Sequence, residues 1–158
     1  MHPLLSCLIY VALIGIISQL IGPFLPRHWF HADRFPFRTY AWEKGGKVYI
    51  KLGIRRWKDL VPDMSRIAKN MVTKKLPLGS GSAQMERLVQ ETCVAELVHA
   101  VLIIFGLWIL HLWPGWGGII FWILYAVFGN LSFMMIQRFN RPRLVRLASK
   151  AKKRENNR

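Results

Sequence analysis

The 158-residue sequence has few cysteines and few acidic residues, and both shortages exclude classes of protein. Two cysteines cannot form the disulfide framework of a small secreted scaffold. Only 8 Asp and Glu stand against 23 Lys and Arg, which gives a formal net charge of +15. This charge would favour a nucleic-acid partner, but 53% hydrophobic residues and seven Trp are typical of a membrane protein. Intrinsic disorder is excluded, because so much apolar surface must be buried.

Three long apolar segments predict transmembrane helices, over about 4–25, 94–113 and 117–136. The first and third contain no charged residue, and each is long enough to cross a hydrocarbon core about 30 Å thick. A cleaved signal peptide is the alternative for the first, but it lacks the basic start and the small-residue cleavage site. The Trp-Pro-Gly-Trp-Gly link at 113–117 predicts a tight turn at the membrane–water interface.

The basic residues are confined to the other two segments, and this sets the predicted orientation. Residues 27–92 hold 14 Lys and Arg, and residues 137–158 hold the other 9. Three crossings place both segments on one side of the membrane, which the positive-inside rule assigns to the cytoplasm. We therefore predict an all-α integral membrane protein, with 1–158 forming a single membrane domain. It would lie in a bacterial cell membrane with the N-terminus outside and the C-terminus cytoplasmic.

Both basic segments are expected at the cytoplasmic interface, with anionic inner-leaflet lipids as partners in place of nucleic acid. Residues 27–92 interleave aromatic and charged side chains, which is typical of an interfacial layer. Residues 144–150 predict a basic helix on the leaflet, and we expect 152–158 to fray. Where the third span ends, Arg forks could hold phosphates, either of lipid headgroups or of a substrate such as coenzyme A. This cluster contains Gln137, Arg138, Asn140, Arg141 and Arg143.

Glu96 and His99 lie within the second span, where an ionisable side chain is costly and is a candidate for function. Their i, i+3 spacing places both on one helix face. A carboxylate that holds an imidazole is typical of a histidine general base. The alternatives are a structural pair between helices and half of a di-iron site, but no second Glu-x-x-His exists, so we expect no metal. Asn130, in mid-span, is expected to hydrogen-bond a neighbouring helix.

Two weaker patterns are also present. His28 and Asp33 have the spacing used by glycerolipid acyltransferases, but this chain has no room for the α/β domain that carries that motif. Cys93 could in principle form an acyl-enzyme. Neither pattern is required by the hypotheses that follow.

Four blocks, 42–47, 55–63, 91–99 and 137–144, together resemble the glycosyl-4,4'-diaponeurosporenoate acyltransferase family. The most specific are Glu-Thr-x-x-Ala-Glu-Leu-x-His at 91–99 and Gln-Arg-aromatic-Asn-Arg-Pro-Arg-Leu at 137–144. Members of this family are small bacterial membrane enzymes that place a fatty acyl group on the sugar of a glycosylated carotenoid. The resemblance extends from about residue 42 to residue 144.

The resemblance implies acyl transfer from a thioester, acyl-coenzyme A or acyl carrier protein, to a sugar hydroxyl of a lipid-like glycosylated acceptor. No cofactor is expected beyond this co-substrate. On this hypothesis His99 deprotonates the hydroxyl and Glu96 orients the imidazole, with Glu91 and Asp63 as further candidate carboxylates. The donor would be held by Arg55, Arg56, Trp57, Lys58, Gln137, Arg138, Asn140, Arg141 and Arg143.

Two alternatives stay open at this stage. The protein could be an acyltransferase that acts on another lipid or small-molecule acceptor. It could also be a non-enzymatic membrane anchor or scaffold that binds anionic lipids. The oligomeric state is open in all three cases.

Overall fold

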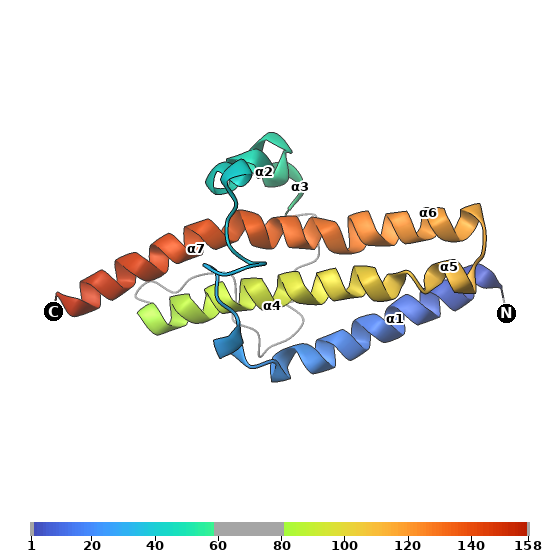
Figure 1. Ribbon diagram of the computed structural model, residues 1–158, viewed down its shortest axis with the longest axis horizontal. Coiled ribbons are helices and arrows are strands. Elements are labelled where there is room, and N and C mark those ends of the chain that lie inside the picture. The colour runs from blue at the N-terminus through green and yellow to red at the C-terminus, as the bar shows by residue number, and fades with distance from the viewer. Residues whose placement is uncertain (1, 59–80, 158) are drawn as a thin grey trace. The chain divides into compact units, whose positions relative to one another are not determined.

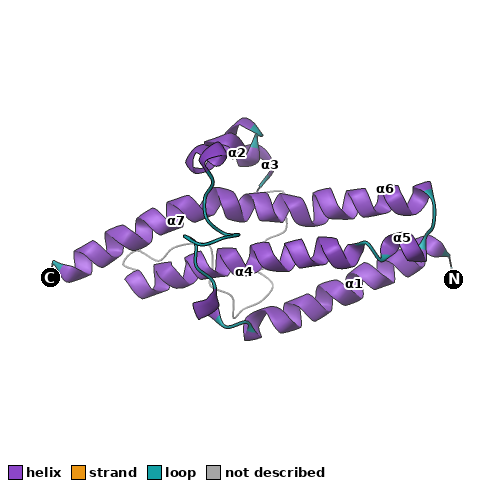
Figure 2. Ribbon diagram, in the orientation of Figure 1, coloured by secondary structure: helices purple, strands orange, loops and turns teal. Residues whose placement is uncertain are grey.

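The computed structural model describes residues 2–58 and 81–157, and in these ranges it contains helices and loops but no strand (Figure 2). The predicted all-α class is therefore confirmed. Asp63 lies outside the described residues. Within the described ranges, three helical stretches are long and apolar enough to cross a membrane: Pro3–Phe24, Ser82–Leu112 and Trp116–Asn156. Each predicted span falls on one of these stretches, and the second and third stretches extend beyond the predicted spans into the polar segments.

The chain packs as two compact units. One unit combines Met1–Pro26 with Val94–Met135, and the other combines Arg27–Cys93 with Ile136–Arg158. We call them the apolar unit and the basic unit, because the first contains no Lys or Arg and the second contains all 23. Two helices, α4 (Ser82–Gly106) and α7 (Ser132–Asn156), have residues in both units.

The apolar unit consists of helices joined by short connections. Its elements are α1 (Pro3–Ile21), the 3₁₀ turn Gly22–Phe24, part of α4, α5 (Ile109–Leu112), α6 (Trp116–Leu124) and a π-helical turn, Tyr125–Leu131. Helix α5 lies between α1 and α6 (Figure 1). The Tyr10 hydroxyl donates to the Phe105 carbonyl at 2.8 Å, and Trp122 Nε1 donates to the Ile103 carbonyl at 3.4 Å. These bonds join α1 and α6 to α4.

The apolar unit exposes large hydrophobic side chains around most of its surface. Along α1 only Cys7 is buried, while Leu13, Ile17 and Leu20 are more than half exposed. A helix that is apolar on every face and exposed on nearly all of them is suited to lipid rather than water. The exposure pattern thus agrees with the predicted membrane spans.

Glycines permit two close approaches in the apolar unit. A Cβ on Gly106 would lie 2.7 Å from the Tyr125 ring, so α4 could not pack as closely on the π-helical turn with a larger residue. In the predicted Trp-rich turn, Gly115 has a φ of +98°, and Gly117 and Gly118 pack against Trp113. The tight turn predicted at 113–117 is confirmed between α5 and α6.

In the basic unit, short elements pack against α7 around residues 138–141. The described elements of this unit besides α7 are η2 (Arg27–Trp29), η3 (Ala41–Gly46), α2 (Lys47–Lys51), α3 (Ile54–Trp57) and the start of α4. At the end of η3, the backbone of Lys44, Gly45 and Gly46 is left-handed, with φ of 48°, 64° and 92°. A Cβ on Gly46 would lie 3.4 Å from the Phe139 carbonyl oxygen. Glycine at this position therefore combines the required φ with close contact to α7.

The C-terminal helix differs from the prediction in one respect. Helix α7 continues through Pro142 to Asn156, so the expectation that 152–158 frays is wrong for 152–156. Pro142 removes only one backbone bond, the one to the carbonyl four residues earlier. Near the helix end, Glu155 accepts hydrogen bonds from the Ser82 backbone N–H at 2.9 Å and from the Ser82 hydroxyl. These bonds hold the last turn of α7 to the first turn of α4.

Candidate functional site

A buried carboxylate, Glu43, is the centre of one polar cluster in the basic unit. Its side chain is 1% exposed and accepts from the Tyr40 backbone N–H at 2.6 Å, the Tyr49 hydroxyl and Arg138 Nη1 at 3.0 Å. Arg138 also donates to the Pro36 carbonyl at 2.8 Å. One carboxylate thus connects the loop before η3, helix α2 and helix α7.

The contacts of Glu43 keep it ionised. Burial on its own raises the carboxyl pKa, but the hydrogen bonds from Tyr49, Tyr40 and Arg138 and the charge of Arg138 outweigh it, so the pKa lies below its usual value. The pKa of Tyr49 is raised, first by burial and then by its bond to this carboxylate. The phenol therefore stays protonated and can continue to donate.

We expect Glu43→Gln to remove a pH-dependent part of the stability. Because the folded-state pKa is depressed, the stabilisation is present above the unfolded value of 4.5 and is lost as pH falls below it. The melting temperatures of wild type and Glu43→Gln should differ most at neutral pH and converge in acid. Thermal unfolding of both proteins in detergent, from neutral pH to acid, measures this difference in melting temperature. A gap that persists below the folded-state pKa would contradict the assignment, and Glu86→Gln, an exposed acid, is the matched control.

Arg141 is the most enclosed of the described cations in the basic unit, with 2% exposure. Its Nε donates to Thr92 Oγ1 at 2.9 Å, its Nη2 to the Thr92 carbonyl at 3.0 Å and its Nη1 to the Phe37 carbonyl at 2.6 Å. The guanidinium also lies over the Phe37 ring. Arg138 and Arg141, which the sequence assigned to donor phosphates, thus direct their described bonds to the protein itself. Substrate binding by either remains a prediction, and this geometry favours an anchoring role.

Glu91, like Arg138 and Arg141, bonds to other groups of the protein. Its carboxylate accepts from Arg27 Nε at 3.0 Å and Arg27 Nη2 at 3.2 Å, and Arg87 lies at 4.0 Å. This ion pair connects η2 to α4 within the basic unit. The proposed catalytic role of Glu91 is untested, and its bidentate partner favours a structural one.

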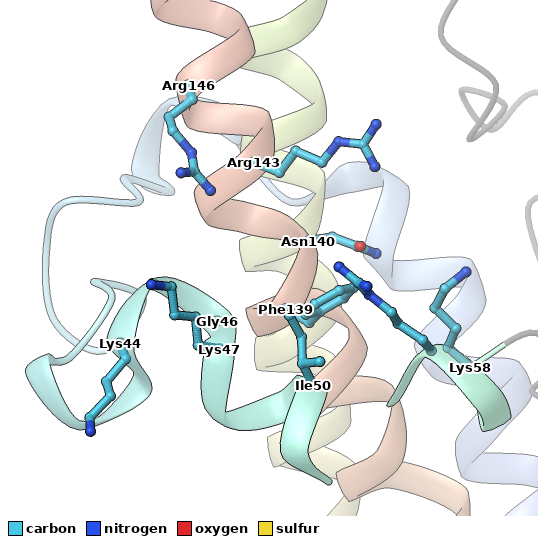
Figure 3. Close-up of a pocket in the computed structure, with 11 residues that line it drawn as sticks. Lys44, Gly46, Lys47, Ile50, Lys58, Phe139, Asn140, Arg143 and Arg146 are labelled. Carbon is cyan, nitrogen blue, oxygen red and sulfur yellow. The ribbon is translucent and has the colours of Figure 1, made fainter. Parts of the chain in front are cut away.

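A basic pocket with a volume of about 760 Å³ opens on the basic unit (Figure 3). Four residues predicted to bind the donor line it: Arg55, Lys58, Asn140 and Arg143. The others in that prediction, Arg56, Trp57, Gln137, Arg138 and Arg141, do not. Among the residues that the structure describes, none of those that line the pocket is acidic, and the remaining ones are Lys44, Gly45, Gly46, Lys47, Ile50, Phe139 and Arg146.

The apolar unit contains a second polar cluster, around His99. Asn130 is 1% exposed; its Nδ2 donates to the Tyr125 carbonyl at 3.1 Å, and its Oδ1 lies 3.0 Å from His99 Nδ1. This amide orientation makes Oδ1 the acceptor, so the proton of a neutral imidazole is on Nδ1 and Nε2 bears the lone pair. Phe133 stacks on the ring, with centroids 4.7 Å apart. The expected hydrogen bond of Asn130 to another helix is confirmed.

Glu96 is buried, with 5% exposure, and is the only Asp, Glu, Lys or Arg in the apolar unit. The sequence predicted that it orients His99, whereas the partner at Nδ1 is Asn130. A direct role of Glu96 on the imidazole remains a prediction. In the described ranges, no three His, Cys, Asp or Glu residues are grouped as a metal site would need.

Sequence reasoning did not identify Glu43 and Asn130 in these roles. Glu43 stands within the Trp-Glu-Lys-Gly-Gly-Lys block that carried the resemblance, and an acid two residues before a Gly-Gly pair in a basic segment was a usable signal. Asn130 was identified as a helix–helix contact, but its partner is 31 residues away in sequence. Only the packing of the helices identifies His99 as that partner.

A family model described as glycosyl-4,4'-diaponeurosporenoate acyltransferase matches residues 26–150. The chain belongs to this family. Glycosyl-4,4'-diaponeurosporenoate acyltransferases of Staphylococcus aureus strains bovine RF122 and USA300 are each 28% identical to it over 149 residues, covering 94% of this chain and 89% of the relative. No solved structure matches the chain. As a member of the glycosyl-4,4'-diaponeurosporenoate acyltransferase family, the protein is an enzyme of the acyltransferase type, and the predicted resemblance is confirmed.

Proposed function

We propose that this acyltransferase moves a fatty acyl group from a thioester donor, acyl-coenzyme A, to a sugar hydroxyl of a glycosylated carotenoid. The acceptor class comes from the names of the relatives, which are similar over nearly the whole chain. The observation that carries the proposal is the imidazole of His99, held by Asn130 with Nε2 as its basic nitrogen. The reaction would take place at the cytoplasmic face of the membrane.

The reaction needs one base and no covalent enzyme intermediate. His99 Nε2 takes the proton of the sugar hydroxyl, and the oxygen attacks the thioester carbonyl. The new C–O bond forms as the C–S bond breaks, and the thiolate leaves as a thiol after taking the proton from His99. Cys93 is completely buried, which does not favour it as an acyl carrier. Glu96, Glu91 and Asp63 stay as candidate carboxylates for charge balance.

The composition of the two units supports a reaction between a lipid-like acceptor and a charged donor. The apolar unit offers lipid-exposed faces suited to an acyl chain and a carotenoid. The basic unit contains every Lys and Arg of the chain. By the positive-inside rule this supports a cytoplasmic location for the basic unit, including its part of α7. A cytoplasmic site would also be the one that a thioester made inside the cell can reach.

Sealed membrane vesicles of known orientation test the function and the face together. Inside-out vesicles that contain the protein and a glycosylated carotenoid should convert added acyl-coenzyme A into a carotenoid glycoside ester, detected by mass spectrometry. Right-side-out vesicles should do so only after permeabilisation, because the donor does not cross the membrane. Vesicles without the protein are the control. An ester found on another lipid, with the carotenoid glycoside unchanged, would overturn the acceptor, and equal rates in intact vesicles of both orientations would overturn the face.

A further inference from the structure

We propose that the basic pocket binds the phosphorylated nucleotide end of coenzyme A, so that the acyl donor is a coenzyme A thioester and not an acyl carrier protein. The inference rests on the proposed function and assigns its donor site. All of the described residues that line the pocket belong to the basic unit. The pocket volume of about 760 Å³ lies within the range of about 300–1,000 Å³ that is usual for small-molecule sites.

The charge of the pocket matches a ligand with several phosphates. Six basic side chains line it, and they come from three separate segments: residues 44–47, residues 55–58 in and just after α3, and the middle of α7 (Figure 3). The nucleotide of coenzyme A carries a 3'-phosphate and a 5'-diphosphate, whereas the carrier-protein prosthetic group has one phosphodiester. Several phosphates spaced along one ligand need cations from more than one segment to contact them. A single phosphodiester would use fewer cations than the pocket offers.

The α7 wall of the pocket presents one helix face. Phe139 and Arg143 are four residues apart, and Asn140, Arg143 and Arg146 follow at intervals of three, so their side chains lie along neighbouring rows. Phe139 and Ile50 add an apolar surface beside the cations. A purine can stack on an aromatic ring of this kind, and the Asn140 amide has both a donor and an acceptor for a base edge.

The buried Glu43–Arg138 ion pair holds the two walls of the pocket together. Glu43 immediately precedes Lys44 on one wall, and Arg138 immediately precedes Phe139 on the other. Their side chains are joined at 3.0 Å, and neither lines the pocket. The pocket walls are therefore positioned before a ligand arrives, which lowers the entropy lost on binding.

The test measures binding of adenosine 3',5'-bisphosphate to the purified full-length protein in nanodiscs of zwitterionic lipid. The pocket variant is Lys47→Gln with Arg143→Gln, and the matched control is Lys51→Gln with Lys150→Gln. The control residues are exposed, belong to the same unit and do not line the pocket. Losing two charged hydrogen-bond donors should weaken binding by about 100-fold in the pocket variant and by less than about threefold in the control. The KM for acyl-coenzyme A should rise similarly, with little change in kcat.

Three results would overturn the inference. The first is equal affinity for adenosine 3',5'-bisphosphate in the pocket and control variants. The second is a wild-type protein that binds phosphatidylglycerol vesicles but not the nucleotide, together with a pocket variant that no longer binds the vesicles. That result would assign the pocket to lipid headgroups. The third is faster acyl transfer from an acyl carrier protein than from acyl-coenzyme A. By contrast, nucleotide binding with no acylation of the glycosylated carotenoid would overturn the proposed function and leave the pocket assignment intact.

Discussion

His99→Ala should lower acyl transfer by about 10²–10⁴-fold while the protein remains folded. Among the described residues of the apolar unit, the imidazole of His99 is the group whose hydrogen-bond partner fixes a basic nitrogen, and on the proposed mechanism its loss removes the base for the sugar hydroxyl. Truncation also leaves the buried Asn130 Oδ1 without this hydrogen-bond partner, so the rates are compared at a temperature at which both proteins are folded. The measurement is the steady-state rate of ester formation by purified protein, with melting temperature recorded in parallel.

The same substitution at His111 is the control. His111 lies in the same predicted span, in α5, and its ring is exposed beside Trp108. His111→Ala should keep nearly the wild-type rate. If His99→Ala also keeps it, the general base is another residue, and Glu96 becomes the first candidate to replace in the same assay.

Asn130→Ala separates positioning from simple packing. Without the amide, the imidazole loses the acceptor that holds the proton on Nδ1, so kcat should fall by about tenfold while KM for both substrates changes little. Asn130→Asp keeps an acceptor and should recover part of the rate. Equal losses in kcat and in melting temperature for both variants, with no recovery, would mean that Asn130 only supports the fold.

The sequence predicted the helices well, because each depends on composition over a long segment. Long apolar stretches identified the three spans, and Trp113 and Gly115 identified the turn. The continuation of α7 to Asn156 could not be predicted in this way. It depends on the bonds between Glu155 and Ser82, two residues that are 73 positions apart in the sequence.

The prediction of donor-binding residues relied largely on residue type. In the structure, the predicted arginines lie in different environments. Arginines at 138, 141 and 143 look equivalent in the sequence, because each follows the third span. Two of them point to Glu43, Thr92 and backbone carbonyls, while Arg143 lines the pocket. Helical spacing separates them only when the positions of residues 36–43 are known, and those positions depend on tertiary packing.

Arg141→Ala should destabilise the protein by about 3–5 kcal/mol. The substitution leaves Thr92 Oγ1 and the carbonyls of Thr92 and Phe37 without their charged donor in a buried site. For a chain of this size the melting temperature should fall by about 10 °C. Arg141→Lys keeps the charge but cannot reproduce the planar fork of donors, so it should recover only part of the loss. Thermal unfolding in detergent measures both variants.

Arg143→Ala is the matched comparison, because it removes the same side chain two residues later on α7. Arg143 is exposed and lines the basic pocket, so its loss should leave the melting temperature within about 1–2 °C of wild type and raise the KM for acyl-coenzyme A. The two substitutions should thus affect different properties: Arg141→Ala lowers stability, and Arg143→Ala lowers the affinity for the donor. If Arg141→Ala keeps the wild-type melting temperature and raises KM as Arg143→Ala does, Arg141 binds the donor as its position in the sequence first predicted, and its bonds to Thr92 and Phe37 do not stabilise the fold.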